Sequence, residues 1–227
     1  MSSTESGVQN PARQAADRVG PSVVRVGRHG GRGGGIVIEP GAVVTNAHNL
    51  RGPEITVSFA DGRQETGTVA GHDIDGDLAV VRVDTGDAPV VEWGGSADLG
   101  EAVYTVSRLG DGGVRVTSGA VSATDRTFRG PRGRRISGSL EHTAPLGRGS
   151  SGSPVVDGEG RVVGLNTHRL GEGFYLALPA DDAASHADRV WDDDIVPSRH
   201  DYIRSPNVSV AFDPAWAEAG HPAPATG

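Results

Sequence analysis

Ser151 lies in a glycine- and serine-rich segment, Arg148-Gly149-Ser150-Ser151-Gly152-Ser153-Pro154, directly before an apolar run. Glycine on both sides of a serine lets the backbone turn tightly and brings bare N–H groups close to the hydroxyl. That combination suits a nucleophile beside donors that stabilise a developing oxyanion. The same pattern alone is also typical of an ordinary turn between two strands.

A serine nucleophile needs a base, and the base needs an acid that orients it. His48 follows the apolar run Ala42–Thr45, where a strand is expected to end, and a histidine there can be held rigidly. Asp77 directly precedes the apolar run Leu78–Val81, so its partly desolvated carboxylate should seek an N–H donor. Taken alone, His48 could also be an ordinary surface histidine, and Asp77 could be a cap at the start of a strand. The occurrence of His48, Asp77 and Ser151 in one chain, in that order, is more specific than any one of them.

Short β-rich runs separated by turn residues dominate the chain, and they predict an all-β fold. About six runs lie on either side of residue 93, which favours two six-stranded antiparallel β-barrels with the active site in the cleft between them. Short terminal helices are expected at Pro11–Val19 and Ala180–Asp192. The expected division is a leader with a short helix at 1–20, a first barrel at 21–93, a second barrel at 94–179, a helix at 180–192 and a partly disordered tail at 193–227. Val208–Phe212 could add an edge strand.

The net charge and the amino-acid composition argue against several classes of protein. The formal net charge of −8 argues against a general nucleic-acid binder, and the absence of cysteine excludes disulfides and thiolate metal sites. No metal or cofactor is expected. A polar N-terminus and the lack of a long apolar stretch favour a cytoplasmic protein, with no membrane partner.

Two other segments have competing interpretations. Five arginines fall in an expected loop between two strands, where they fit either a solvated loop or a contact with an acidic partner: Arg126, Arg129, Arg132, Arg134 and Arg135. The glycine run Gly30–Gly35 lacks the Lys-Ser/Thr of a phosphate-binding loop, and is interpreted as a flexible connection.

Three segments together resemble the trypsin-fold serine peptidases, most closely the HtrA/Deg type: Thr45-Asn46-Ala47-His48, Asp77-Leu78-Ala79-Val80 and Gly149-Ser150-Ser151-Gly152-Ser153-Pro154. The resemblance covers roughly residues 20–180. It implies His48 as general base, Asp77 as its orienting acid and Ser151 as nucleophile. Backbone N–H groups of Gly149 and Ser151, with Ser150 nearby, would form the oxyanion hole, and the reaction would be peptide-bond hydrolysis through an acyl-enzyme.

The sequence also departs from this family. Ser150 stands in place of asparagine, Ser153 in place of glycine, and Thr143 where aspartate is usual. The polar segment after Pro179 is too short for the PDZ domain that HtrA-type enzymes usually carry. The alternative function is therefore a latent or inactive trypsin-fold module that binds partners through its cleft or its arginines.

Substrate preference should depend on the residues expected beside the serine, which are Thr143, Pro145, Leu146, Thr167 and His168. No carboxylate lies among them, which argues against a preference for Lys or Arg before the scissile bond. Pro145 and Leu146 favour small apolar side chains, whereas His168 with Thr167 would favour acidic ones.

Overall fold

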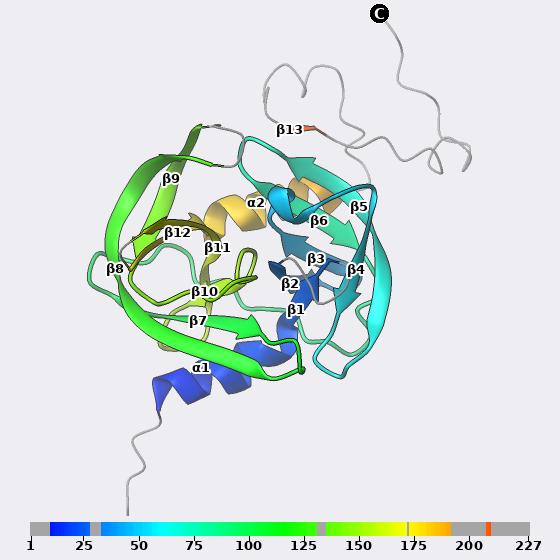
Figure 1. Cartoon of the computed structure of the whole chain (residues 1–227), viewed down its shortest axis with the longest axis horizontal. Coiled ribbons are helices and arrows are strands. Elements are labelled where there is room, and N and C mark those ends of the chain that lie inside the picture. The colour runs from blue at the N-terminus through cyan, green and yellow to red at the C-terminus, as the bar shows by residue number, and fades with distance from the viewer. Residues whose placement is uncertain (1–9, 28–32, 131–134, 172, 192–207, 210–227) are drawn as a thin grey trace, which may run out of the picture.

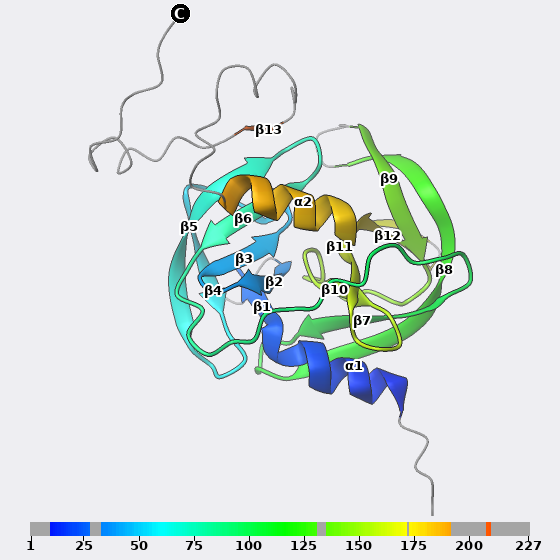
Figure 2. The same cartoon turned by 180° about the vertical axis from the view of Figure 1, so that it is seen from behind.

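The computed structural model describes residues 10–27, 33–130, 135–171, 173–191 and 208–209. Its two β units lie side by side (Figures 1 and 2). In the view of Figure 1, helix α1 (Pro11–Val19) lies along the lower edge of the molecule and helix α2 (Ala180–Trp191) lies behind the strands. The first β unit contains six strands: β1 (Val23–Val26), β2 (Gly33–Glu39), β3 (Ala42–Thr45), β4 (Glu54–Ser58), β5 (Gln64–Asp73) and β6 (Leu78–Arg82). The second contains β7 (Ala102–Arg108), β8 (Val114–Arg129), β9 (Arg135–His142), β10 (Pro154–Val156), β11 (Val162–Gly171) and β12 (Phe174–Pro179).

Both units are built from antiparallel pairings between strands. In the second unit these pairings form a closed barrel in the order β10-β11-β12-β9-β8-β7. In the first unit the order is β5-β4-β1-β2-β3-β6, and an additional pairing of β5 with β6 joins the two ends. The prediction of an all-β chain with two six-stranded units is therefore confirmed. A further strand, β13 (Val208–Ser209), pairs with His72 and Asp73 of β5, within the segment expected to add an edge strand.

Helix α1 (Pro11–Val19) begins and ends where the sequence predicts. The Asn10 side chain accepts a hydrogen bond from the N–H of Ala12. Pro11 suits the first helical position because proline has no N–H, and an N–H there would have no acceptor within the helix. The second helix, α2 (Ala180–Trp191), ends one residue before the predicted Asp192, which lies outside the described residues. No helix in the described part of the chain is long and apolar enough to cross a membrane.

One hydrophobic cluster joins the two β units and both helices. Its buried side chains come from all four parts: Ala15 and Val19 of α1, Ile36 and Val80 of the first unit, Leu165 and Leu178 of the second unit, and Ala183 of α2. The connection between the units is also fixed, because Val91 donates to Val37 and Gly94 donates to Val162 through backbone hydrogen bonds. Since apolar burial stabilises in proportion to area, this shared core holds the facing loops of the two units in place.

Two expectations about connections are wrong. Gly33 and Gly34 belong to β2, because glycine residues let a strand lie directly against neighbouring backbone and side chains. Arg126 and Arg129 lie in β8, and Arg135 begins β9, so these residues are not in a loop. Other predicted residues of those connections, including Arg132 and Arg134, lie outside the described residues, as do 1–9 and all of the tail except 208–209.

Candidate active site

The pairing of β3 with β6 brings His48 and Asp77 together. Thr45, the last residue of β3, lies opposite Ala79 in β6, so the residues just after β3 meet the residue just before β6. The chain then forms the short 3₁₀ turn Ala47–Asn49, which carries His48. Asp77 has a φ of 58°, a left-handed conformation that aspartate tolerates better than most residues. The backbone N–H of Ala47 donates to the Asp77 carbonyl at 3.1 Å and holds the two segments together.

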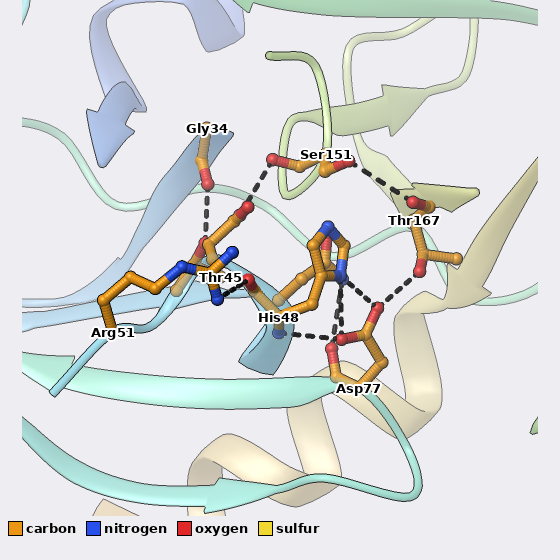
Figure 3. A network of polar contacts seen from close by, with 9 residues as sticks. Gly34, Thr45, His48, Arg51, Asp77, Ser151 and Thr167 are labelled. Carbon is orange, nitrogen blue, oxygen red and sulfur yellow. Dashed lines mark hydrogen bonds and ion pairs between the residues drawn. The ribbon is translucent and has the colours of Figure 1, made fainter. Parts of the chain in front are cut away.

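The Asp77 carboxylate accepts three hydrogen bonds and is only 3% exposed (Figure 3). His48 supplies two of them, from its backbone N–H at 3.0 Å and from ring Nδ1, which lies 2.8 Å from Oδ2. The hydroxyl of Thr167, from β11 of the other unit, donates to Oδ2 at 2.5 Å. Because Nδ1 must carry the proton to donate, Nε2 of a neutral His48 presents its lone pair and can act as a base.

Ser151 lies between the two β units, held by contacts on both sides. Its carbonyl oxygen accepts from the backbone N–H of Gly34 at 2.7 Å and from Nδ2 of Asn49 at 3.1 Å, both in the first unit. Its hydroxyl donates to the carbonyl oxygen of Thr167 at 3.3 Å, in the second unit. Among the described residues, no hydrogen bond joins the Ser151 hydroxyl to Nε2 of His48.

Glycine is required where the two units touch beside Ser151. Gly152 has a φ of +85°, and a Cβ there would lie 2.2 Å from the carbonyl oxygen of Gly34. Any side chain at this position would therefore push the serine loop away from β2. The same carbonyl of Gly34 accepts from the Thr45 hydroxyl at 2.7 Å, so β2, β3 and the serine loop form one hydrogen-bonded contact.

Two backbone N–H groups beside the serine hydroxyl remain available. Within the described residues, neither Gly149 nor Ser151 donates a backbone hydrogen bond, whereas Gly152 donates to Asn166 at 2.7 Å and Ser153 to Ser150 at 3.0 Å. Free N–H groups on a turn are the donors that an oxyanion requires. The Gly149 φ of +80° needs glycine there.

Ser150 is buried, with an exposed fraction of 4%, and its side chain faces the second unit. Its Oγ accepts a hydrogen bond from the Ser107 hydroxyl of β7 at 3.1 Å. This contact anchors the loop just before Ser151 to the barrel wall. The Ser150 side chain is therefore a support for the loop.

The first three residues expected to bind substrate are held by backbone contacts. Thr143 Oγ1 accepts from the N–H of Ala120 at 3.0 Å. The carbonyl oxygen of Pro145 accepts from the Thr117 hydroxyl at 2.7 Å. Leu146 is half-buried, and its carbonyl oxygen accepts from Arg169. These contacts fix the loop before Ser151, and a substrate-binding role for its residues stays a prediction.

Two further expected residues have contacts that the sequence did not indicate. The Thr167 side chain points at Asp77 and donates to its carboxylate, so it helps to position that group, and a substrate-binding role for Thr167 stays a prediction. The His168 ring stacks on Phe128, with ring centroids 5.5 Å apart. Asn49, Gly34 and Arg169 were missed as site residues. For Asn49 a local signal existed, because it directly follows His48 at the same strand end.

The arginines of β8 and β9 have a partly structural explanation. Arg126 forms an ion pair with Glu141 at 3.1 Å. The two strands continue past it because the apolar residues Phe128 and Ile136 face each other and are buried. A contact with an acidic partner through these arginines stays a prediction. The described residues contain no cluster of three or more His, Cys, Asp or Glu side chains that could hold a metal ion.

Comparison with known proteins places this geometry in a family. Residues 33–165 match the family model described as "Trypsin-like peptidase domain". The chain belongs to the trypsin-like peptidase family. This match covers more than half of the chain and includes His48, Asp77 and Ser151.

Individual relatives of this trypsin-like peptidase chain are of the HtrA/DegP type. The "probable periplasmic serine endoprotease DegP-like" of Halomonas elongata is 34% identical over 70% of this chain, and the match spans 35% of that relative's length. The serine endoprotease from Yersinia pestis has a solved structure with a TM-score of 0.69 and 27% identity, covering 82% of this chain and 69% of that one. The structure titled "HtrA-type protease AlgW with decapeptide" has a TM-score of 0.72 at 22% identity, covers 80% of this chain and 68% of that one, and shows the shared fold.

Proposed function

We propose that this chain is a serine endopeptidase that uses a Ser151-His48-Asp77 triad. The observation that carries the proposal is the His48–Asp77 pair, in which Nδ1 lies 2.8 Å from a buried carboxylate beside the loop of Ser151. A base oriented in this way, next to a serine with free backbone donors, is the arrangement that acyl transfer requires. Family membership supports the same activity.

A peptide substrate would bind along β11, at the junction of the two units. Residues 167–171 of β11 pair with β12 on one side, and within the described residues no strand pairs with them on the other. An extended peptide can add to such an edge through backbone hydrogen bonds. This edge begins at Thr167, whose carbonyl oxygen already accepts from the Ser151 hydroxyl, so an added strand would pass directly beside the nucleophile.

The reaction would begin when the Ser151 hydroxyl turns from the Thr167 carbonyl toward Nε2 of His48. Nε2 takes the proton as Oγ bonds to the substrate carbonyl carbon, and the resulting oxyanion accepts from the N–H groups of Gly149 and Ser151. The protonated His48 then gives its proton to the leaving amine as the C–N bond breaks. A water, deprotonated by His48, then attacks the acyl-enzyme ester. The protonated His48 returns its proton to Oγ as the ester C–O bond breaks, which releases the acid and restores the Ser151 hydroxyl.

A fluorophosphonate probe tests the proposal because it bonds covalently to an activated serine. We expect the wild-type chain to take up one probe per molecule, mapped to Ser151 by peptide mass spectrometry, and the Ser151→Ala variant to take up none. Hydrolysis of a casein or fluorogenic peptide should be lost in the same variant. Labelling that persists after Ser151→Ala would refute the assignment. A wild-type chain that is folded but neither labelled nor active would instead favour a latent or inactive binding module.

A further inference from the structure

Arg169 joins the two chain segments that flank the candidate nucleophile. It lies in β11, two residues beyond Thr167, whose carbonyl oxygen accepts from Ser151. Its Nη2 donates to the carbonyl oxygen of Leu146 at 2.8 Å, in the loop that leads to Ser151. The guanidinium therefore lies between β11 and the 143–148 loop, where both approach the serine.

Aromatic rings fill the space on one side of this guanidinium. Its central carbon lies 5.3 Å from the centroid of the Tyr175 ring. That ring in turn stacks on His142, with centroids 5.8 Å apart. Tyr175 and His142 are buried, with exposed fractions of 6% and 0%, whereas Arg169 is exposed. The stack thus presents the guanidinium of Arg169 as its solvent-facing layer, above the two buried rings.

Three arginines surround the loop, and the described residues provide none of them with a carboxylate. A Cβ at Gly147 would lie 2.5 Å from Nη1 of Arg115, which places that guanidinium against the loop. Arg148 belongs to the loop itself and is exposed. No ion pair within the described residues involves Arg115, Arg148 or Arg169, whereas five other arginines do pair with carboxylates: Arg13, Arg18, Arg63, Arg126 and Arg161. The loop is thus a local positive region in a chain whose net charge is −8.

We propose that Arg169 selects an acidic side chain, Asp or Glu, in the substrate residue before the scissile bond. A peptide whose carbonyl carbon meets Ser151 while its backbone pairs with the free edge of β11 directs that side chain between Leu146 and Arg169. A guanidinium has five N–H donors. Within the described residues Arg169 uses one of its nitrogens as a donor, to the carbonyl oxygen of Leu146, so its other N–H groups can bind a carboxylate. This inference rests on the proposed peptidase activity, and it replaces the apolar preference that Pro145 and Leu146 suggested.

Arg169, and not His168, provides the cation for this recognition. The His168 ring stacks on Phe128, which uses its face for packing within the barrel. Arginine, unlike histidine, does not lose its charge between neutral and mildly alkaline pH, so the preference should be the same at both. A Lys or Arg side chain at the same substrate position would meet like charge from the surrounding arginines.

Peptides that differ only in the residue before the scissile bond test this inference. Fluorogenic peptides with Ala, Val, Leu, Asp, Glu or Lys at that position would be compared on the wild-type chain by kcat/KM. We expect Asp or Glu to be preferred over Ala and Val. Arg169→Gln should lower kcat/KM for the acidic peptides by at least about tenfold, as expected for loss of a charged hydrogen bond, and leave the Ala peptide nearly unchanged. Arg169→Lys should retain part of the preference.

A matched control is Arg13→Gln, which removes one positive charge from the exposed surface of α1. This variant should change the ratio of kcat/KM for the Asp or Glu peptides to kcat/KM for the Ala peptide by less than about twofold. A wild-type chain that prefers Ala or Val, or an Arg169→Gln variant with an unchanged ratio, overturns this inference and leaves the peptidase proposal intact. If no peptide is cleaved and the fluorophosphonate probe does not label Ser151, the proposed function fails and this inference fails with it.

Discussion

Acidification should destabilise this fold through one buried histidine, His142. Its ring is fully buried in the second β unit, and burial lowers the pKa of His142 to about 4. Nε2 lies 2.9 Å from Oδ1 of Asn166 and must donate to it, because the Asn166 amide nitrogen already donates to the carbonyl oxygen of Ser153. In the part of the chain that the structure describes, Nδ1 of His142 has no hydrogen-bond partner, so a proton there would be a buried charge without an acceptor.

The sign of the effect follows from the two pKa values. The folded value of about 4 lies below the value of 6.5 for an unperturbed histidine, so the unfolded chain binds the proton more tightly. The free energy of unfolding is therefore at its full value above about pH 7 and falls as the pH drops from about 6.5 to about 4. Each pKa unit corresponds to about 1.4 kcal/mol, which gives about 2 kcal/mol lost at about pH 5 and about 3 kcal/mol in total.

Urea unfolding of the wild-type chain and of His142→Gln, at about pH 7.5, 6 and 5, measures this loss. Glutamine can still donate to Asn166 but does not titrate. We expect the wild-type chain to lose about 2 kcal/mol more than the variant between about pH 7.5 and 5. Burial also lowers the pKa of His72, but His72 is present in both proteins and its contribution cancels. A difference between the two proteins that stays constant across this pH range would refute the reasoning.

Two further substitutions test the contacts around Ser151. Gly152→Ala should cost more than about 3 kcal/mol of unfolding free energy, because strain at positive φ adds to the collision with Gly34, whereas Gly62→Ala, with a φ of +88° and open space, should cost about 1–2 kcal/mol. Equal costs in urea unfolding would contradict the collision. Thr167→Val should lower kcat about tenfold with little change in KM, because the Asp77 carboxylate loses one of its donors. Thr167→Ser should restore the rate, and an unchanged rate in Thr167→Val would contradict the positioning role.

The sequence predicted most of the fold because its signals are local. Apolar runs and turn chemistry predicted about six strands on either side of residue 93, and proline marked the start of α1. The error at β8 has a clear cause. The charged residues Arg126 and Arg129 predicted a loop between two strands, but β8 continues to Arg129 because buried Phe128 faces Ile136 across the hairpin.

The candidate site was predictable where its residues flank strands or lie in a glycine-rich turn. His48 and Asp77 flank strands that pair, so their meeting follows from the register of β3 and β6. The contact of Thr167 with Asp77 joins residues 90 positions apart and depends on how the two units pack. The position of Arg169 depends on the 143–148 loop in the same way, and nothing in the local sequence separates it from the other arginines. A cytoplasmic location stays a prediction from the sequence.

The contacts of Ser151 explain why both β units are needed for the proposed chemistry. Its carbonyl oxygen is held by Gly34 and Asn49 of the first unit, while its hydroxyl and the Asp77 carboxylate both contact Thr167 of the second. A small slide of one unit past the other would therefore change the position of the nucleophile and of the acid together. The buried cluster shared by both units and both helices resists that slide. Substitutions in this cluster should thus lower activity as well as stability, even far from Ser151.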